Sequence, residues 1–178
     1  ISFTAPSCSF DILSLSSRTI LCAILGPIPF VLVRSLWSPV ATAIAQTFNV
    51  DLAYEVGTAI YREMKEYGCT FWLAPALNIH RNPLCGRNFE YYSEDPLLSG
   101  AMAAAVTKGV QQEDGYYVTL KHFAANNQED NRKGVSSNVS ERALREIYLR
   151  GFEYAVKEGK AKGVMTAYNK INGIYAPN

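Results

Sequence analysis

Residues that could bind a polar ligand or move a proton gather at three places along the chain. They are amides, histidines, cations and a tyrosine, namely Asn78, His80, Arg81, Asn82, Lys121, His122, Tyr168 and Asn169. Lys121 sits inside an apolar run, where an unpaired ammonium group is costly to bury. It must therefore either form a structural ion pair with Glu90, Glu94 or Asp95, or serve a ligand.

Each of the three groups lies at the end of a segment that we expect to be a β-strand. The segments are rich in apolar residues, and they are Thr70–Leu77, Tyr116–Phe123 and Gly163–Tyr168. They begin about 46 residues apart with a helix expected in each interval, which favours right-handed βαβ units and a parallel sheet. Because the carboxyl ends of parallel strands meet at one edge, the polar residues should form one ligand site.

The expected helices are marked by their ends and by their apolar periodicity. Val50–Tyr67 carries an apolar residue at every fourth position, with Asn49 as its N-cap and Gly68 as its end. A second helix should begin at Ser99 and end before Gly115.

A third helix is indicated by Asn138 and Glu141, whose spacing is typical of a capping box, and it should end at Gly159. Three such units do not close a barrel, since a complete (β/α)8 barrel takes ~250 residues. The predicted fold class is therefore α/β, an incomplete (β/α)8 TIM-like barrel with parallel strands alternating with helices.

The composition excludes several functions. The chain has 178 residues, of which 48% are hydrophobic and 19% charged, with a net charge of +1. This charge provides no footprint for nucleic acid and no basic surface for a membrane. The four cysteines include no C-x-x-C pair, so we expect scattered thiols in a reducing compartment rather than a zinc site or a disulfide scaffold. No metal and no organic cofactor is expected.

The N-terminal segment differs from the rest of the chain. Ile20–Val33 is apolar over 14 residues, which is short for a membrane span of ~20 residues. It is compatible with the core of a signal peptide, with a buried strand, or with a segment unrelated to the fold. We expect the ordered domain to start near Trp37, dividing the chain into 1–36 and 37–178, and we expect a cytoplasmic location.

Four longer segments carry a family resemblance. They read NPLCGRNFEYYSEDPLLSG from residue 82, KHFAANNQEDNR from 121, SERALREIYLRGFE from 140 and VMTAYNKINGIYAPN from 164. Together they resemble the N-terminal barrel domain of glycoside hydrolase family 3, over Trp37 to Asn178. The KHFAANNQE variant is similar to the β-glucosidase branch of the family rather than to its β-N-acetylglucosaminidase branch.

The resemblance implies a sugar-binding site with charged donors around a ring of hydroxyl groups. The residues that match the family's binding positions are Arg87, Lys121, His122, Arg132, Met165 and Tyr168. The first four would bind sugar hydroxyls, and the last two would line the wall near the reacting carbon. Two simpler interpretations stay open, in which Met165 belongs to the core and Arg132 caps a helix or pairs with Glu129.

The resemblance also implies hydrolysis of terminal β-D-glucosyl or related residues, from a β-linked oligosaccharide or glycoside, by a retaining double displacement. That mechanism needs two carboxyl groups ~5 Å apart. The nucleophilic Asp and the acid/base are expected beyond Asn178, in the remaining domains of a full-length enzyme, and Glu90, Glu94 and Asp95 are expected to be scaffold. We therefore expect this chain alone to be marginally stable and inactive. The alternatives are a non-catalytic remnant that binds sugar weakly, and a phosphorylase.

Overall fold

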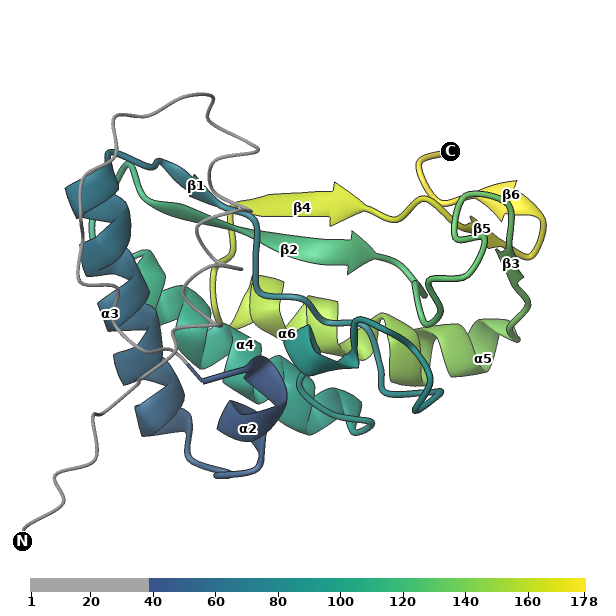
Figure 1. Ribbon diagram of the computed structural model, residues 1–178, viewed down its shortest axis with the longest axis horizontal. Helices are drawn as coiled ribbons and strands as arrows, with labels where there is room; N and C mark the ends of the chain where they lie inside the picture. The colour runs from purple at the N-terminus through teal and green to yellow at the C-terminus, as the bar shows by residue number, and fades with distance from the viewer. Residues whose placement is uncertain (1–38) are drawn as a thin grey trace, which may run out of the picture. The chain divides into compact units, whose positions relative to one another are not determined.

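The computed structural model describes residues 39–178, so the expectations for residues 1–36 and for a domain start near Trp37 fall outside it. The described part begins with a short helix, α2 (Ala41–Ala45). It continues as a sheet with helices packed on one of its faces (Figure 1). None of the helices in this part is long and apolar enough to cross a membrane.

The main sheet has three parallel strands in the order β1 (Phe71–Trp72), β2 (Tyr117–Phe123) and β4 (Gly163–Thr166). Sequence order and spatial order agree, so each helical connection leads to the neighbouring parallel strand, as in the predicted βαβ units. The arrows of β2 and β4 point the same way in Figure 1, so their carboxyl ends lie at one edge of the sheet. This edge is where the sequence predicts the polar residues to meet.

The helices that cover the sheet are α3 (Val50–Tyr67), α4 (Pro96–Val110) and α6 (Arg150–Lys157). Helix α4 packs against both of the others (Figure 1). The prediction for α3 is confirmed at both ends, because Oδ1 of Asn49 accepts the first free N–H groups and Gly68 closes the helix at a φ of 67°.

Helices α3 and α4 cross at two glycines. A Cβ atom on Gly57 would collide with the carbonyl oxygen of Val106, and one on Gly109 would collide with that of Tyr54. The absence of side chains lets the two backbones approach closely. On the sheet side, α4 contacts β2, and Leu120 of β2 is fully buried, as are Met102, Val106 and Val110 of the helix.

The start of α4 corrects the sequence prediction. The helix begins at Pro96 rather than at Ser99, because Oδ1 of Asp95 accepts the N–H groups of Leu97 at 2.7 Å and Leu98 at 3.2 Å. The N–H group at the first helical position has no partner within the helix, so proline, which has no N–H, loses no hydrogen bond there. The Asp-Pro pair was therefore the stronger start signal.

The third helical segment is also different from the prediction. Ser140, not Asn138, accepts the N–H of Ala143 at its start. The segment then runs as α5 (Glu141–Ala143), a π-helical turn over Leu144–Tyr148, and α6. It ends at Lys157, two residues before the expected Gly159. The side chain of Asn138 instead contacts Ser136, so the capping-box prediction is wrong.

The outer strands of the sheet are shorter than predicted. Regular pairing of β1 stops at Trp72, although the chain stays beside β2 as far as Leu77, whose N–H donates to the carbonyl of Lys121. Pro75 has no N–H to contribute to a ladder, which breaks the regular strand. Similarly, β4 ends at Thr166 instead of Tyr168.

A second small sheet was not predicted. It consists of β3 (Ser136–Ser137), β5 (Lys170–Ile171) and β6 (Ile174–Tyr175), with β3 parallel to β5 and β5 antiparallel to β6. It lies beyond the carboxyl ends of β2 and β4 (Figure 1). It therefore ties the segment after β4 to the segment after β2.

Candidate functional site

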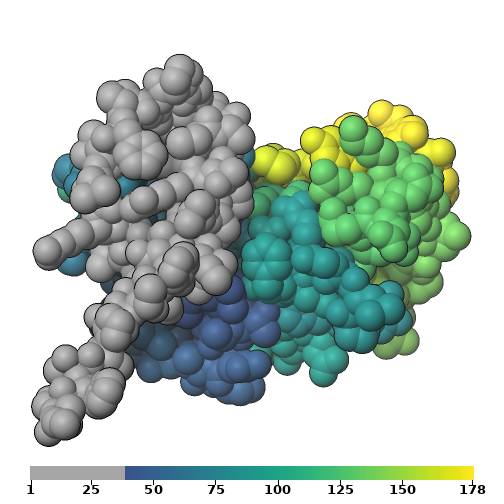
Figure 2. Space-filling model, in the orientation of Figure 1, coloured from purple at the N-terminus to yellow at the C-terminus, as the bar shows by residue number. Residues whose placement is uncertain are grey.

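The predicted polar residues meet at the carboxyl ends of the main strands. Arg87 comes from the long loop between β1 and α4, Lys121 and His122 from the end of β2, and Arg132 from the loop that follows β2. Figure 2 shows the two loops meeting on the surface, where the teal segment near residue 90 borders the green segment near residue 130. The structure thus brings together residues that are up to 45 positions apart in the sequence.

Glu90 neutralises the lysine and the first arginine of the site. Its Oε2 lies 2.9 Å from Nζ of Lys121, and its Oε1 pairs with Nε of Arg87. The Lys121 side chain is only 13% exposed, so the ion pair required by its burial exists, and Glu90 is the partner. Burial raises the pKa of the Glu90 carboxyl, but the charges and hydrogen bonds of Lys121 and Arg87 outweigh it and leave the pKa below its ordinary value.

The 3₁₀ turn Asn88–Glu90 places this carboxylate. The two other acids that the sequence offered for Lys121 have different places. Asp95 caps α4, and Glu94 lines a separate hollow next to α2.

A second carboxylate, Glu129, bridges the two arginines. Its Oε2 lies 2.8 Å from Nη1 of Arg132, and its Oε1 lies 3.8 Å from Nη1 of Arg87. The pairing of Arg132 with Glu129, left open by the sequence, is therefore present. Charges alternate along the row Lys121, Glu90, Arg87, Glu129, Arg132, which leaves three cations against two carboxylates.

His122 is held from one side by Asn78. The Asn78 side chain bonds to both backbone groups of His122 and contacts its ring at Nδ1. Burial lowers the pKa of His122, and the positive charges of Arg87 and Lys121 lower it further, to about 3. The imidazole is therefore neutral at physiological pH.

Tyr91 and Asn126 hold the two loops together beneath the charged row. The Tyr91 hydroxyl donates to the carbonyl of Asn126 at 3.3 Å and accepts from Nδ2 of the same residue at 3.2 Å. Nδ2 also donates to Glu129 at 3.0 Å. Tyr91 is fully buried. Neither residue was singled out from the sequence, although both lie inside the NFEYY and AANNQE motifs.

Tyr168 closes the row at its far end. Its ring lies 5.3 Å from the guanidinium carbon of Arg132 and 5.8 Å from Nζ of Lys133, and 59% of the residue is exposed. Met165 lies on β4 and is half-buried. Tyr168 therefore contacts the charged row through Arg132. For Met165 the structure gives a position on β4 and partial burial.

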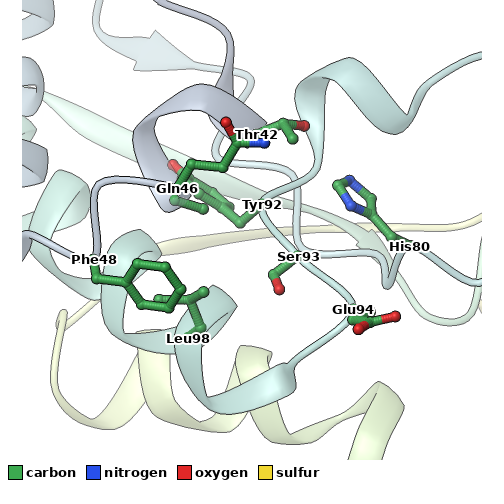
Figure 3. A pocket seen from close by; sticks show the side chains of 9 residues that line it. Thr42, Gln46, Phe48, His80, Tyr92, Ser93, Glu94 and Leu98 are labelled. Atoms are coloured by element: carbon green, nitrogen blue, oxygen red, sulfur yellow. The ribbon is translucent and has the colours of Figure 1, made fainter.

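A separate hollow lies beside α2 (Figure 3). It has a volume of about 210 Å³ and contains none of the six predicted site residues. His80 borders it and contacts the carbonyls of Asn88 and Tyr91 through Nε2, at 2.8 and 3.1 Å. Thr42 of α2 donates to the same two carbonyls. Both residues thus anchor the loop that carries Glu90 and do not face the charged row.

The charged row suits a ligand with many hydroxyl groups. Arg87 and Arg132 can donate at several positions, Lys121 can donate from an ammonium group, and a neutral imidazole can accept or donate. Hydrogen bonds from charged donors are about twice as strong as neutral ones. The excess of one positive charge also favours an additional carboxylate or a partly negative ligand at the same place.

Comparison with known proteins gives consistent matches. Residues 31–177 match the family model described as the glycosyl hydrolase family 3 N terminal domain. Beta-glucosidase A of Butyrivibrio fibrisolvens is 55% identical over 135 residues, which are 76% of this chain and 16% of that protein. The beta-glucosidase of Ruminococcus albus is 54% identical over 137 residues, 77% of this chain and 14% of that protein.

Solved structures agree with these matches. Beta-glucosidase 3B from Thermotoga neapolitana in complex with glucose aligns with a TM-score of 0.75 and 62% identity over 78% of this chain and 19% of that one. Beta-glucosidase from Kluyveromyces marxianus in complex with glucose gives a TM-score of 0.75 and 45% identity, over 78% and 16%. The chain thus spans less than a fifth of these relatives, and the predicted class, an incomplete TIM-like α/β barrel, is confirmed.

Proposed function

The chain belongs to glycosyl hydrolase family 3, and from this premise we propose that its charged row binds the terminal β-D-glucosyl, or related β-glycosyl, residue of a β-linked oligosaccharide or glycoside. The whole protein then hydrolyses that bond by a retaining double displacement. The observation that carries the proposal is the alternating row from Lys121 to Arg132 at the carboxyl ends of the strands. Its glucose-bound relatives are beta-glucosidases by name.

The geometry of the row supports the binding roles that we propose. Lys121, Arg87 and Arg132 each keep donor positions that their carboxylate partners do not occupy. These N–H groups would donate to sugar hydroxyls, and His122 would contact a neighbouring hydroxyl. Tyr168 and Met165 would form the wall beside the reacting carbon, with Tyr168 presenting an exposed ring.

The carboxylates of the row are unsuited to the chemical step. A retaining glycosidase needs one carboxylate free to attack and one carboxyl group with a raised pKa to protonate the leaving oxygen. Glu90 and Glu129 each bridge two cations, and the pKa of Glu90 is lowered. We therefore propose that both reacting groups come from other parts of the whole protein, and that this chain alone binds glucose without hydrolysing a glucoside.

We also propose a cytoplasmic location, on a single argument. Two of the four cysteines lie in the described part, and Cys69 and Cys85 are both buried free thiols. Unpaired cysteines are typical of proteins in a reducing compartment.

A chimeric enzyme tests the proposed function. Residues 39–178 would replace the matching segment of the Thermotoga neapolitana beta-glucosidase 3B, and hydrolysis of 4-nitrophenyl β-D-glucoside would be measured. We expect an active chimera in which Lys121→Met lowers kcat/KM at least about tenfold, since a hydrogen bond from a charged donor contributes roughly 1.5–3 kcal/mol. Lys108→Met, at the opposite end of the strands, is the control and should change little.

Two results would count against the proposal. A folded chimera without activity would contradict the assignment of hydrolysis to this chain's parent. An active chimera that tolerates Lys121→Met as well as Lys108→Met would contradict the placement of the sugar in the charged row.

A further inference from the structure

Asn78 makes an unusual set of contacts with a single residue. It is 2% exposed and lies where the chain leaves the side of β2. Its Nδ2 donates to the carbonyl oxygen of His122 at 3.0 Å, and its Oδ1 accepts the backbone N–H of His122 at 3.0 Å. The same Oδ1 lies 3.1 Å from Nδ1 of the His122 ring.

The backbone of His122 fixes which way the Asn78 amide points. A carbonyl oxygen only accepts and a backbone N–H only donates, so Nδ2 and Oδ1 cannot exchange places without losing both bonds. Oδ1 is itself only an acceptor. A hydrogen bond between Oδ1 and the ring therefore requires that Nδ1 of His122 carries a proton.

The other ring nitrogen is then bare. A neutral imidazole with a proton on Nδ1 has a lone pair on Nε2, and Nε2 makes no hydrogen bond with any residue of the described part. The charges that act on the ring are those of Arg87, Lys121 and Arg132, which lower its pKa, and of Glu90, which opposes them. Three cations disfavour a proton on Nε2 and favour a lone pair.

We propose that Asn78 is a positioning residue, which holds His122 as the Nδ1-protonated tautomer so that Nε2 accepts a hydrogen bond from a hydroxyl group of the sugar. The identity of that donor rests on the proposed function, whereas the tautomer rests on the contacts of Asn78 alone. The site then offers both hydrogen-bond donors and an acceptor, because the cations donate to sugar oxygens and His122 accepts from one hydroxyl group. A ligand that lacks this hydroxyl leaves Nε2 without a partner.

Long-range ¹H–¹⁵N NMR spectra of the ¹⁵N-labelled chain test the tautomer. The sequence contains only two histidines, so a His80→Gln variant assigns the His122 signals. We expect Nδ1 to be protonated and Nε2 to be bare near pH 7. In Asn78→Leu, which keeps the branching of the side chain but has no amide, a substantial fraction of the Nε2-protonated form should appear.

Two further variants control for general damage. Asn127→Leu removes a partly buried amide that donates to the carbonyl of Ile79 at 2.6 Å and does not contact His122, so the tautomer should not change. Asn78→Asp keeps the acceptor facing Nδ1, so it should retain the Nδ1 proton even if Asn78→Leu does not fold. A protonated Nε2 in the unmodified chain, or an unchanged tautomer in folded Asn78→Leu, would overturn the role of Asn78.

Titration with D-glucose separates this inference from the proposed function. We expect the sugar to shift the ¹⁵N resonance of Nε2 more than that of Nδ1, and Asn78→Leu to weaken glucose binding about fivefold or more. If the tautomer is as stated but glucose shifts neither nitrogen, sugar binding at His122 is wrong while the positioning role of Asn78 stands.

Discussion

The two ends of the main sheet hold similar charged residues in different environments. At the carboxyl ends, the side chains of Lys121, Glu90 and Arg87 are between 13% and 22% exposed, and they share partners. At the amino ends, Lys65 and Glu113 form an ion pair whose members are 54% and 55% exposed. Beside that pair, other charged residues line a hollow of about 370 Å³, and they are Lys108, Asp114, Lys160 and Lys162.

The difference shows that burial, rather than residue type, gives a charge its structural effect. Hydrogen bonds with Tyr61 and Glu113 raise the pKa of Lys65, yet water surrounds both ions and screens their attraction. At the carboxyl ends, less water surrounds the charges. The attraction within an ion pair is therefore stronger there, and a charge that loses its partner is more costly to bury. We therefore expect the carboxyl ends of the strands to be sensitive to substitution and the amino ends to tolerate it.

The largest test of this contrast removes one carboxylate from each end. Glu90→Gln leaves Lys121 and Arg87 without their shared partner, so we expect the free energy of unfolding to fall by about 2–3 kcal/mol. Glucose affinity should fall at least about tenfold, because both donors lose their orientation. Glu113→Gln should leave urea unfolding and glucose titration unchanged. Equal effects of the two substitutions would contradict the contrast.

Acid should destabilise the chain mainly through the residues at the carboxyl ends of the main strands. The pKa of His122 falls from 6.5 to about 3 on folding, so between these values the unfolded state binds more protons. Stability is thus complete above about pH 6.5 and is lost as the pH falls, by about 2.5 kcal/mol between pH 7 and pH 4.5. The lowered pKa of Glu90 adds a further loss below its ordinary value of 4.5.

Urea unfolding at a series of pH values measures this dependence. His122→Gln should flatten the curve between pH 7 and pH 4.5, whereas Glu113→Gln should leave it unchanged in that range. A curve that is equally steep in His122→Gln would mean that the acid sensitivity arises elsewhere.

The sequence predicted the elements and the charged motifs because their signals are local. The apolar periodicity and the caps of Val50–Tyr67 lie within one segment, and Arg87, Lys121 and His122 lie in motifs that keep their spacing. Capping was less predictable, since Asn138 and Ser140 are both good N-caps. The folded chain decides between them, since Ser140 accepts the N–H of Ala143 and Asn138 contacts Ser136.

The supports of the site were not predictable, because they join distant segments. Tyr91 and Asn126 are 35 residues apart, and Asn78 and His122 are 44 apart. Each polar group had many possible partners in the sequence, and only the packed sheet selects one. The shortest strands, such as β3, were missed because two residues carry no periodic signal.

A tyrosine at each end sharpens the contrast further. Tyr168 lies over Arg132 and Lys133, so Tyr168→Leu should lower the unfolding free energy by about 0.5 kcal/mol. It should also weaken glucose binding about threefold, if the ring forms the wall of the sugar site. Tyr117 donates to Asp114 at the amino end, and Tyr117→Leu should leave glucose affinity unchanged. NMR titration of both variants measures the difference.

The smallest effect comes from backbone strain, which is present at both ends. Lys160 at the amino end and Ala125 at the carboxyl end have φ values of 60° and 61°, which favour glycine. Lys160→Gly should therefore stabilise the chain by about 0.5 kcal/mol, without a change in glucose binding. Its carbonyl still accepts from Gln111, since that contact involves only backbone at residue 160.

Ala125→Gly relieves the same strain with a different consequence. Ala125 is 3% exposed, and its carbonyl accepts the hydroxyl of Ser137 at 2.8 Å beside the loop that carries Glu129. A glycine there loses a buried methyl group and loosens the loop, so the gain in stability should vanish and glucose affinity should fall about twofold. Urea unfolding and glucose titration of the two glycine variants provide the measurement. If both variants stabilise the chain and leave binding intact, the carboxyl end is not the more constrained of the two.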